Sequence, residues 1–365
     1  MARGLAFAAL GLLLRPVLWW RSRPSLVHRA LSEREYERSA ESEGVVTRVG
    51  VVQLGGRLMA GAAEYAATAY RLVRQAVRGG AHLVVFPEDA GSYPLGGLIP
   101  GVKRFAERGS EGDELTQFES GAVPMAFLLG LLASVSRRIY RTTFSVLAER
   151  FGVHIVAGSG LEMDAEGMLL KCGCLFGPDG CLIGTQPKTH LYPAEATWGM
   201  GRGDRIEVFD TSVGRVSFPI CMDHTFFEPI RVAWLRGAEI VIDPAADAAA
   251  YDAWAQSRGV WGRVQESPAY GIACFMVGEM LGVRFEGRSG VYAPLEMTED
   301  GTGVVAQAES ATREEVLFAD LDLGRLREYR REHPRRFNLA LYARYLPSVY
   351  DRYSDREIGG RRLVT

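Results

Sequence analysis

The sequence is short of cysteine and of net charge. Its five dispersed cysteines leave one unpaired in any complete disulfide scheme, which argues against a disulfide-stapled secreted scaffold and favours a reducing, cytoplasmic compartment. A formal net charge of −2 offers no concentrated basic face, so no nucleic-acid partner is expected. With 47% hydrophobic residues, the 365-residue chain has enough apolar material for a large core and is not disordered.

Long apolar runs are also lacking near the N-terminus. Residues 5–14 form ten uninterrupted apolar positions, well short of the roughly 20 that a membrane-spanning helix needs. Trp19, Trp20 and several arginines follow this run. Three interpretations stay open for residues 5–23: peripheral contact with a membrane surface, an arm that packs on another subunit, or a poorly ordered leader.

No metal or cofactor motif is evident. Cys172 and Cys174 share one face of an expected strand, but Cys181 and Cys274 add neither a second closely spaced pair nor a histidine with zinc-like spacing. All four are therefore interpreted as structural thiols. The glycines of residues 199–203 lack the Lys-Ser/Thr pair of a phosphate-binding loop. The sequence predicts no bound metal and no cofactor.

What the sequence does contain is an alternation of strand-like and helix-like segments from Val45 onward, typical of an α/β fold. A helix is expected over Ala62–Arg78, ended by Gly79-Gly80. We expect a leader and linker over residues 1–44, one catalytic domain over 45–316, and a tail over 317–365 that contacts a neighbouring subunit. The expected strands are 45–53, 81–86, 153–159, 172–176, 181–186, 207–209, 213–220, 240–242, 273–277 and 289–292.

Three reactive side chains stand where strand-like segments meet loops. Glu88 follows Ala81-His-Leu-Val-Val-Phe-Pro, Lys188 follows Cys181-Leu-Ile-Gly-Thr-Gln-Pro, and Cys221 ends Gly214-Arg-Val-Ser-Phe-Pro-Ile. Functional groups collect outside the carboxyl ends of strands in α/β sheets, so these three are expected to converge.

A cysteine, a carboxylate and an ammonium together suffice for acyl transfer. The carboxylate can take the thiol proton, and the cation favours the thiolate and then binds the oxyanion formed during attack. Taken alone, each residue is more simply a buried cysteine or half of a surface ion pair. A surface ion pair would have no reason to end two apolar strands, which favours the catalytic interpretation for Glu88 and Lys188.

These segments resemble the nitrilase superfamily of carbon–nitrogen hydrolases, which carries a Glu-Lys-Cys triad in this order. The similarity extends from about Val45 to Tyr342, and four segments carry it. They are Phe86-Pro-Glu88, Lys188-Thr-His-Leu-Tyr-Pro-Ala-Glu195, Ile220-Cys221-Met-Asp223 with Pro229, and Arg231 through Gly237-Ala-Glu-Ile-Val-Ile-Asp-Pro244.

The resemblance implies an α-β-β-α sandwich that assembles as a homodimer or larger homo-oligomer. It implies Cys221 as nucleophile, Glu88 as general base, Lys188 as oxyanion partner, and Glu195 as a second glutamate beside the triad. The backbone N–H of Met222, just past the nucleophile, is the expected second oxyanion donor. The expected substrate-binding side chains are Tyr192, Trp198 and His224.

The substrate is less sharply indicated than the chemistry. Cys221-Met222-Asp223 lacks the Cys-Trp-Glu usual in enzymes that hydrate nitriles and is closer to the amidase branches, whereas residues 195–204 resemble the nitrilase branch. The leading hypothesis is hydrolysis of a small non-peptide amide through a Cys221 thioester, with nitrile hydrolysis as the close alternative. N-acyl transfer at a membrane surface and a non-catalytic scaffold are the remaining alternatives.

The stretch between Glu88 and Gly158 is longer than the family suggests and includes an apolar segment over residues 124–136. This segment is expected to be a buried helix in the core or in a subunit contact, and the competing interpretation is a lid over an apolar substrate.

Overall fold

A computed structural model describes residues 16–40, 45–92, 95, 98, 125–280, 282–335, 337–354, 357–358 and 361–362. These residues fall into two compact units divided between Leu326 and Arg327. The apolar residues 5–14 and most of the long stretch after Glu88 lie outside the described part, so the expectations for them stay open.

Two mixed β-layers form the centre of the first unit. One has the order β5-β4-β3-β2-β1-β13, and the other the order β6-β7-β8-β9-β11-β12. The layers join where Leu54–Gly56 of β1 pairs with Met276–Gly278 of β9, and β10 adds to β9. The first layer comprises β1 (Val46–Gly56), β2 (Leu83–Val85), β3 (His154–Met163), β4 (Leu169–Phe176), β5 (Leu182–Pro187) and β13 (Glu315–Asp322). The second layer and its extension comprise β6 (Phe209–Thr211), β7 (Gly214–Ser217), β8 (Ile240–Ala245), β9 (Tyr270–Met280), β10 (Val283–Phe285), β11 (Gly290–Tyr292) and β12 (Val304–Gln307).

The central strands of both layers are parallel and apolar along their length. β2 lies between β1 and β3, with Val49 opposite Leu83 and Leu83 opposite His154. β8 lies between β7 and β9 in the same way. Parallel strands covered on both faces need continuous apolar runs rather than alternation, which is why these segments were recognisable as strands. β7 ends at Ser217 rather than at the expected Ile220, because Pro219 has no N–H for the ladder.

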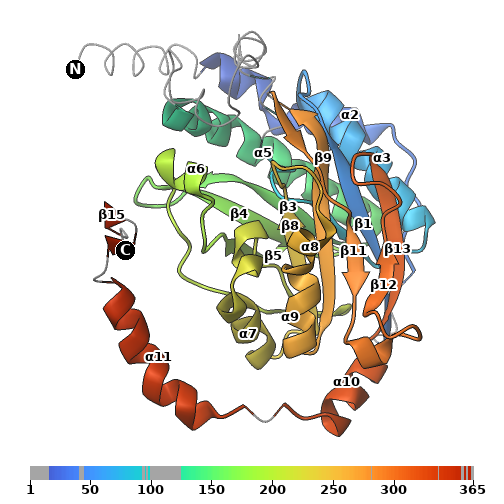
Figure 1. The fold of residues 1–365 in the computed structure, drawn as a ribbon. Helices are drawn as coiled ribbons and strands as arrows, with labels where there is room; N and C mark the ends of the chain where they lie inside the picture. Colours follow the sequence, from blue (N-terminus) through green and yellow to red (C-terminus); the bar gives the residue numbers. More distant parts are fainter. Residues whose placement is uncertain are drawn as a thin grey trace. The chain divides into compact units, whose positions relative to one another are not determined.

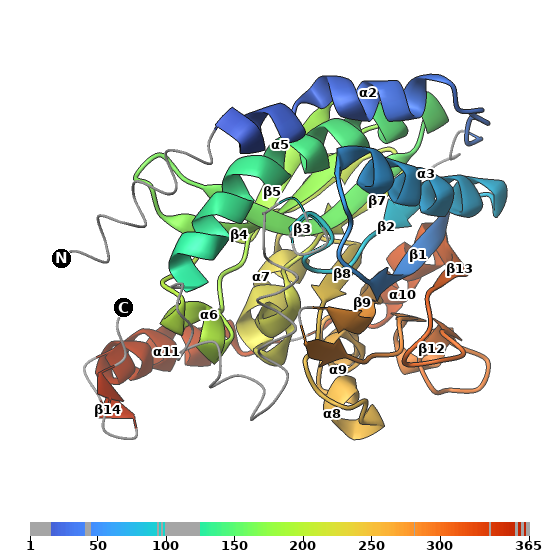
Figure 2. The same ribbon diagram turned by 90° about the horizontal axis from the view of Figure 1, so that it is seen from above.

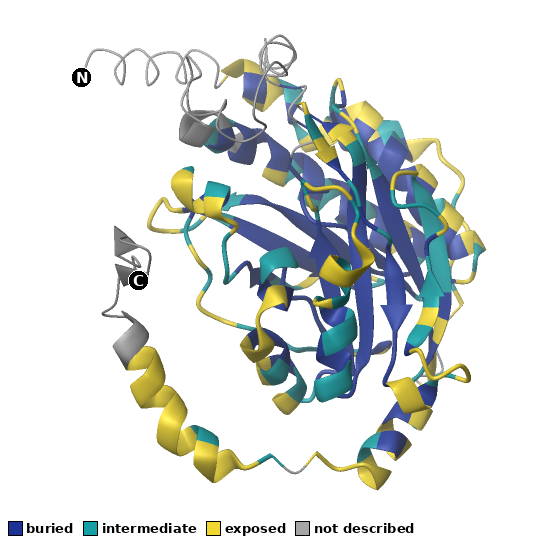
Figure 3. Ribbon diagram, viewed as in Figure 1, coloured by how far each residue is buried: buried dark blue, intermediate teal, exposed yellow. Residues whose placement is uncertain are grey.

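Helices cover the outer face of each layer (Figures 1 and 2). On the first layer lie α3 (Ala62–Arg78), which has the predicted bounds, and α5 (Met125–Phe151). On the second lie α7 (Phe227–Leu235), α8 (Ala253–Ser257) and α9 (Val260–Glu266). Figure 3 shows buried strands between helices with exposed outer surfaces. The predicted α-β-β-α sandwich is confirmed.

The segment before β1 packs on the same chain. α2 (Pro24–Ser32) lies against α3 and α5, and Leu18, Val27 and Leu31 are buried in the core that these helices form. Trp19 and Trp20 stay more than half exposed. Among the described residues, none of the helices combines the length and the apolar character that crossing a bilayer requires. Residues 16–23 therefore belong to a segment that packs on its own chain. None of the three interpretations of the N-terminal segment predicted this.

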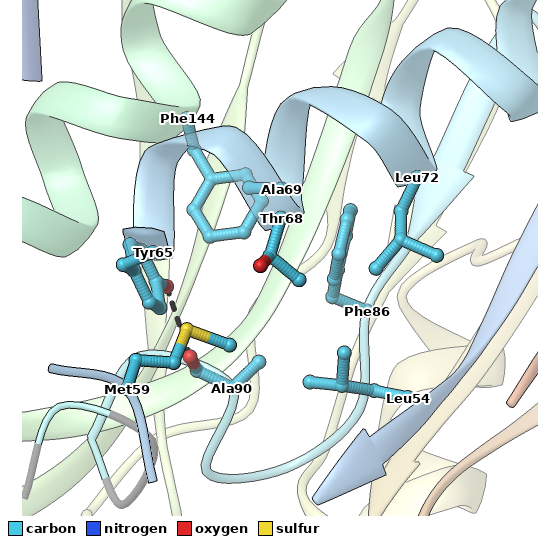
Figure 4. A pocket seen from close by; sticks show the side chains of 9 residues that line it. All are labelled: Leu54, Met59, Tyr65, Thr68, Ala69, Leu72, Phe86, Ala90 and Phe144. Carbon is cyan, nitrogen blue, oxygen red and sulfur yellow. Dashed lines mark hydrogen bonds between the residues drawn. The ribbon is translucent and has the colours of Figure 1, made fainter. Parts of the chain in front are cut away.

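Residues 125–136 of the apolar segment predicted over residues 124–136 form the first part of α5. Leu129, Leu132, Ile139 and Phe144 are buried in the main core, so the described part of this helix serves packing rather than acting as a lid. Between α3, α5 and β1 lies a cavity of about 10 Å³, room for roughly one water molecule (Figure 4). Its lining residues are Leu54, Met59, Tyr65, Thr68, Ala69, Leu72, Phe86, Ala90 and Phe144.

The expected boundary between residues 316 and 317 falls inside β13. Every residue from Glu315 to Asp322 is paired with β1, so residues 317–322 belong to the sheet and not to a tail. Near the C-terminal part of the described chain lie η4 (Leu295–Met297), α10 (Leu323–Glu332), α11 (Leu339–Ser354), β14 (Glu357–Ile358) and β15 (Arg361–Arg362). Leu339, Tyr345 and Tyr350 of α11 are exposed, and a contact of this helix with a second copy of the chain stays a prediction.

Candidate active site

Three loops bring the predicted triad into one region of the first unit. Glu88 follows β2, Lys188 follows β5 directly, and Cys221 begins the short 3₁₀ helix η3 (Cys221–Thr225) after β7. Nζ of Lys188 donates to Oε1 of Glu88 at 2.8 Å, and both side chains are buried. The Cys221 thiol interacts electrostatically with both groups. The Glu88–Lys188 pair therefore lies in a low-dielectric environment, where charge interactions are strong, and the half-buried Cys221 thiol lies beside it.

Glu195 lies in the same cluster, on the short helix α6 (Pro193–Thr197). Its carboxylate contacts Lys188 Nζ at 2.8 Å and accepts the backbone N–H of Tyr192 at 2.8 Å. Burial alone raises the pKa of Glu195, but Lys171 and Lys188 outweigh it and lower the pKa to about 2. Glu195 is thus an ionised anchor for the two ammonium groups at any pH near neutrality.

Lys171, on β4, was not predicted as a site residue. Its ammonium lies 3.1 Å from Oε1 of Glu88, 2.9 Å from Oδ2 of Asp89 and 2.5 Å from Oε1 of Glu195. Its side chain is only 2% exposed. The sequence did contain a signal for this residue, since Lys171 interrupts the apolar run of β4. A lysine is almost never fully buried unless it is paired, so its position in a buried strand indicates a carboxylate partner.

The backbone at Cys221 is left-handed, with φ of 48°. Asp89, directly after Glu88, has φ of 59°. A residue with a Cβ in this region carries strain of about 1–3 kcal/mol, which surrounding contacts must offset, and such strain clusters at functional sites. Burial, reinforced by Glu88 and opposed by Lys188, raises the pKa of the Cys221 thiol well above its ordinary value. The thiol is consequently neutral near pH 7 and needs a base before it can attack.

Asp223 connects the turn that contains Cys221 to the loop that follows Lys188. Its carboxylate accepts the backbone N–H of Ile220 at 2.9 Å and of His190 at 2.7 Å, and the hydroxyl of Thr189 at 2.6 Å. Although burial opposes ionisation, these hydrogen bonds and that of the His190 ring lower the pKa of Asp223. The fully buried carboxylate thereby fixes the loop after Lys188 relative to Cys221.

Asp223→Asn is expected to reduce both activity and stability, because the amide puts an N–H₂ group where an oxygen now accepts. A loss of about 1–3 kcal/mol in the free energy of unfolding is expected for an unsatisfied buried group, measured by urea denaturation. The lowered pKa means that this stability is present above the ordinary pKa of 3.8 and is lost as the pH falls through the folded-state value. The difference between wild type and variant should therefore shrink in acid, and an unchanged difference would contradict this role.

The expected substrate-binding residues have different positions. Met222, half-buried, directly follows Cys221, and the Tyr192 side chain is 43% exposed at the start of α6. Trp198 is partly buried against the main core. His224 is fully buried, and its Nε2–H donates to the carbonyls of Pro219 and Ile242, while burial lowers its pKa to about 4. The structure thus corrects the expectation for His224: the neutral ring joins two backbone segments instead of lining an open pocket.

Asp247, after β8, was missed by the sequence analysis. Its Oδ1 lies 4.0 Å from the sulfur of Cys221. Burial, reinforced by the charge of Glu88, raises the pKa of Asp247 to about 6. The sequence feature that could have indicated Asp247 is its position just after the end of β8, three residues after Asp243-Pro244. Within the described residues, no group of three or more histidine, cysteine, aspartate or glutamate side chains is arranged to hold a metal ion.

The two-layer sandwich with a Glu-Lys-Cys cluster at its strand ends is the arrangement expected of a carbon–nitrogen hydrolase. The sequence model of the carbon–nitrogen hydrolase family matches residues 48–331, and the chain belongs to this family. It is a carbon–nitrogen hydrolase of the nitrilase superfamily, so the predicted family and enzyme class are confirmed.

Named relatives support the same assignment. A probable hydrolase, YhcX, of Bacillus subtilis is 32% identical over 202 residues, which cover 52% of this chain and 38% of that protein. A nitrilase of Pyrococcus abyssi is 28% identical over 285 residues, covering 78% of this chain and 93% of that protein. An amidase from Nesterenkonia sp. AN1, with the acetamide moiety of fluoroacetamide added at its active-site cysteine, has the same fold: TM-score 0.59 and 17% identity, over 84% of this chain and 99% of the amidase.

Proposed function

We propose that this hydrolase cleaves a small non-peptide amide to a carboxylic acid and ammonia through a thioester on Cys221. The observation that carries the proposal is that the half-buried Cys221 thiol lies within electrostatic reach of the buried ion pair between Glu88 and Lys188. Each group has the chemistry that one part of an acyl transfer needs. The substrate class is a small-molecule amide, and nitriles form the alternative class.

The first half-reaction forms the thioester. Glu88 takes the thiol proton of Cys221, and the sulfur attacks the carbonyl carbon while the carbonyl π electrons move to oxygen. The Lys188 ammonium and the backbone N–H of Met222 stabilise the oxyanion. When the tetrahedral intermediate collapses, the carbon–nitrogen bond breaks, the proton held by Glu88 goes to the departing nitrogen, and ammonia leaves.

The second half-reaction hydrolyses the thioester. Glu88, again a carboxylate, takes a proton from water as the water oxygen attacks the carbonyl carbon. The carbon–sulfur bond then breaks, the proton returns to the sulfur, and the carboxylic acid is released. A nitrile would enter by the same thiol attack and give a thioimidate, which two waters convert to the acid and ammonia. Lys188 keeps the charge balance favourable in both halves because it stays protonated beside Glu88 and Glu195.

The proposal is tested by measuring ammonia release from a panel of short aliphatic amides, dicarboxylic monoamides and the corresponding nitriles. Amides are expected to be the better substrates, because the nucleophile turn lacks the Cys-Trp-Glu sequence. Ammonia release from nitriles alone would shift the assignment to the alternative. Ammonia release that depends on an added amine and gives the N-substituted amide instead of the carboxylic acid would replace hydrolysis by acyl transfer.

A further inference from the structure

The cluster contains a second ammonium that the triad chemistry leaves unexplained. Lys171 lies on β4, and Lys188 directly follows the neighbouring strand β5. The backbone N–H of Lys188 donates to the Lys171 carbonyl at 2.8 Å. Their ammonium groups converge on the same two carboxylates, because each contacts both Glu88 and Glu195. It is unusual for two ammonium groups to contact the carboxylate that acts as the general base. A nearby positive charge stabilises the carboxylate and so makes it a weaker base.

Asp89 supplies the opposing charge. Its Oδ2 lies 2.9 Å from the Lys171 ammonium, and its other oxygen accepts the hydroxyl of Ser92 at 2.8 Å. The backbone N–H of Asp89 donates to the hydroxyl of Ser159 at 3.0 Å. These contacts hold a strained left-handed residue in place and aim its carboxylate at Lys171. Burial raises the pKa of Asp89 to about 6, while Lys171 opposes the rise, so the ionisation of Asp89 depends on this lysine.

The charges of the cluster add up in a simple way. Lys188 with Glu88 and Glu195 carries one net negative charge, and the Lys171–Asp89 pair adds one positive and one negative charge. Removing the whole pair leaves the net charge unchanged, whereas removing one member changes it by one unit among side chains that are all buried. Such a change is felt strongly by neighbouring ionisable groups because little solvent screens it.

We propose that Lys171 and Asp89 are a positioning pair: Lys171 fixes the carboxylates of Glu88 and Glu195 beside Lys188, and Asp89 offsets its charge so that Glu88 can still take the Cys221 proton. The inference rests on the proposed role of Glu88 as the base. Lys171 itself contacts the carboxylates and acts on Cys221 through them.

The test follows the alkylation of Cys221 by iodoacetamide as a function of pH, which requires no knowledge of the substrate. All proteins carry Cys181→Ala, because the exposed Cys181 thiol would otherwise react as well. Lys171→Met removes the cation and is expected to move the midpoint of the rate profile upward by about 1 pH unit or more. Asp89→Asn removes the anion and is expected to move it downward. The double variant is expected to return toward the midpoint of the parent protein.

Opposite shifts that cancel in the double variant support the pair, because a purely structural role would lower the labelled fraction without moving the midpoint in two directions. Arg141→Met is the matched control: it removes a part-buried ion pair with Glu162, at 2.6 Å, outside the cluster and is expected to leave the midpoint unchanged. Shifts in the same direction, or no shift in either single variant, overturn the proposal.

If circular dichroism shows that Lys171→Met is unfolded, the proposal is tested by comparing the alkylation midpoints of Asp89→Asn and the double variant. A double variant displaced as far as Asp89→Asn overturns the proposal, and one near the parent midpoint supports it. Failure of the proposed function has a separate signature, since it appears as absence of ammonia release by the wild-type enzyme and leaves the alkylation midpoints unaffected.

Discussion

Cys221→Ala is expected to lower kcat/KM for amide hydrolysis by about 10⁴-fold or more, the scale on which loss of a nucleophile acts in acyl-transfer enzymes. The substitution removes the sulfur that forms the thioester in the proposed mechanism, while Glu88 and Lys188 keep their contact. Any residual turnover would come from direct attack of water on the bound amide, helped by substrate binding and by stabilisation of the oxyanion. Ammonia release measures the loss, and intact mass after incubation with a haloacetamide reports whether the covalent adduct forms.

The control for this experiment is Cys181→Ala. Cys181 is exposed and lies at the start of the segment that leads to Lys188, so it tests whether labelling reflects mere accessibility. The Cys181 variant is expected to retain turnover and one reactive thiol, whereas the Cys221 variant loses turnover and retains labelling only at Cys181. Equal turnover in the Cys221 variant and the wild type would remove the basis of the thioester mechanism.

Lys188→Met is expected to have the largest effect on stability. The variant leaves Glu88 and Glu195 buried with one ammonium fewer, and breaking a buried ion pair in this way costs about 3–5 kcal/mol in the free energy of unfolding. Activity should fall as well, because the oxyanion loses its cation. Urea denaturation of variant and wild type measures the difference in the free energy of unfolding. The dependence of this free energy on urea concentration must be the same for both proteins.

Arg48→Met provides the matched comparison for Lys188→Met. Arg48 and Asp320 form an ion pair with a similar distance, 2.7 Å, but both side chains are more than a third exposed, so the loss should be only about 0–1 kcal/mol. The Lys188 effect should also depend on pH. The folded-state pKa of Glu195, about 2, lies below its ordinary value of 4.5, so its stabilisation is present above pH 4.5 and is lost as the pH falls toward 2. A loss of stability that stays constant over this range would exclude buried charge as its cause.

The fold was largely predictable because its central strands are continuous apolar runs that end in glycine, proline or charged residues. β13 was missed for the opposite reason. Its sequence, Glu315-Val-Leu-Phe-Ala-Asp-Leu-Asp322, is only partly buried, and its partner β1 lies more than 250 residues earlier in the chain. Neither burial nor local spacing distinguishes such a strand from the start of a tail. Pairing across that distance is set by the completed sheet.

In the candidate site, Glu88, Lys188 and Cys221 were predicted from their places at strand ends and from family resemblance, and Glu195 was predicted from the resemblance alone. Lys171 could not be identified in this way, because it lies inside a strand and has no motif of its own. Its partners Glu88, Asp89 and Glu195 come from two other segments, and only the folded arrangement shows that three carboxylates surround it. Asp247 was hidden for the same reason, since its nearness to Cys221 depends on how β7 and β8 pair.

The position of α2 has a practical consequence for any truncation of the protein. Val27 and Leu31 are almost fully buried against α3 and α5, although they precede the region that the family model matches. A fragment that starts at residue 45 would expose the apolar surface that α2 covers, and exposed patches of this kind promote aggregation. Fragments designed from the family boundaries alone would therefore report on a damaged hydrophobic core as much as on the N-terminal segment itself.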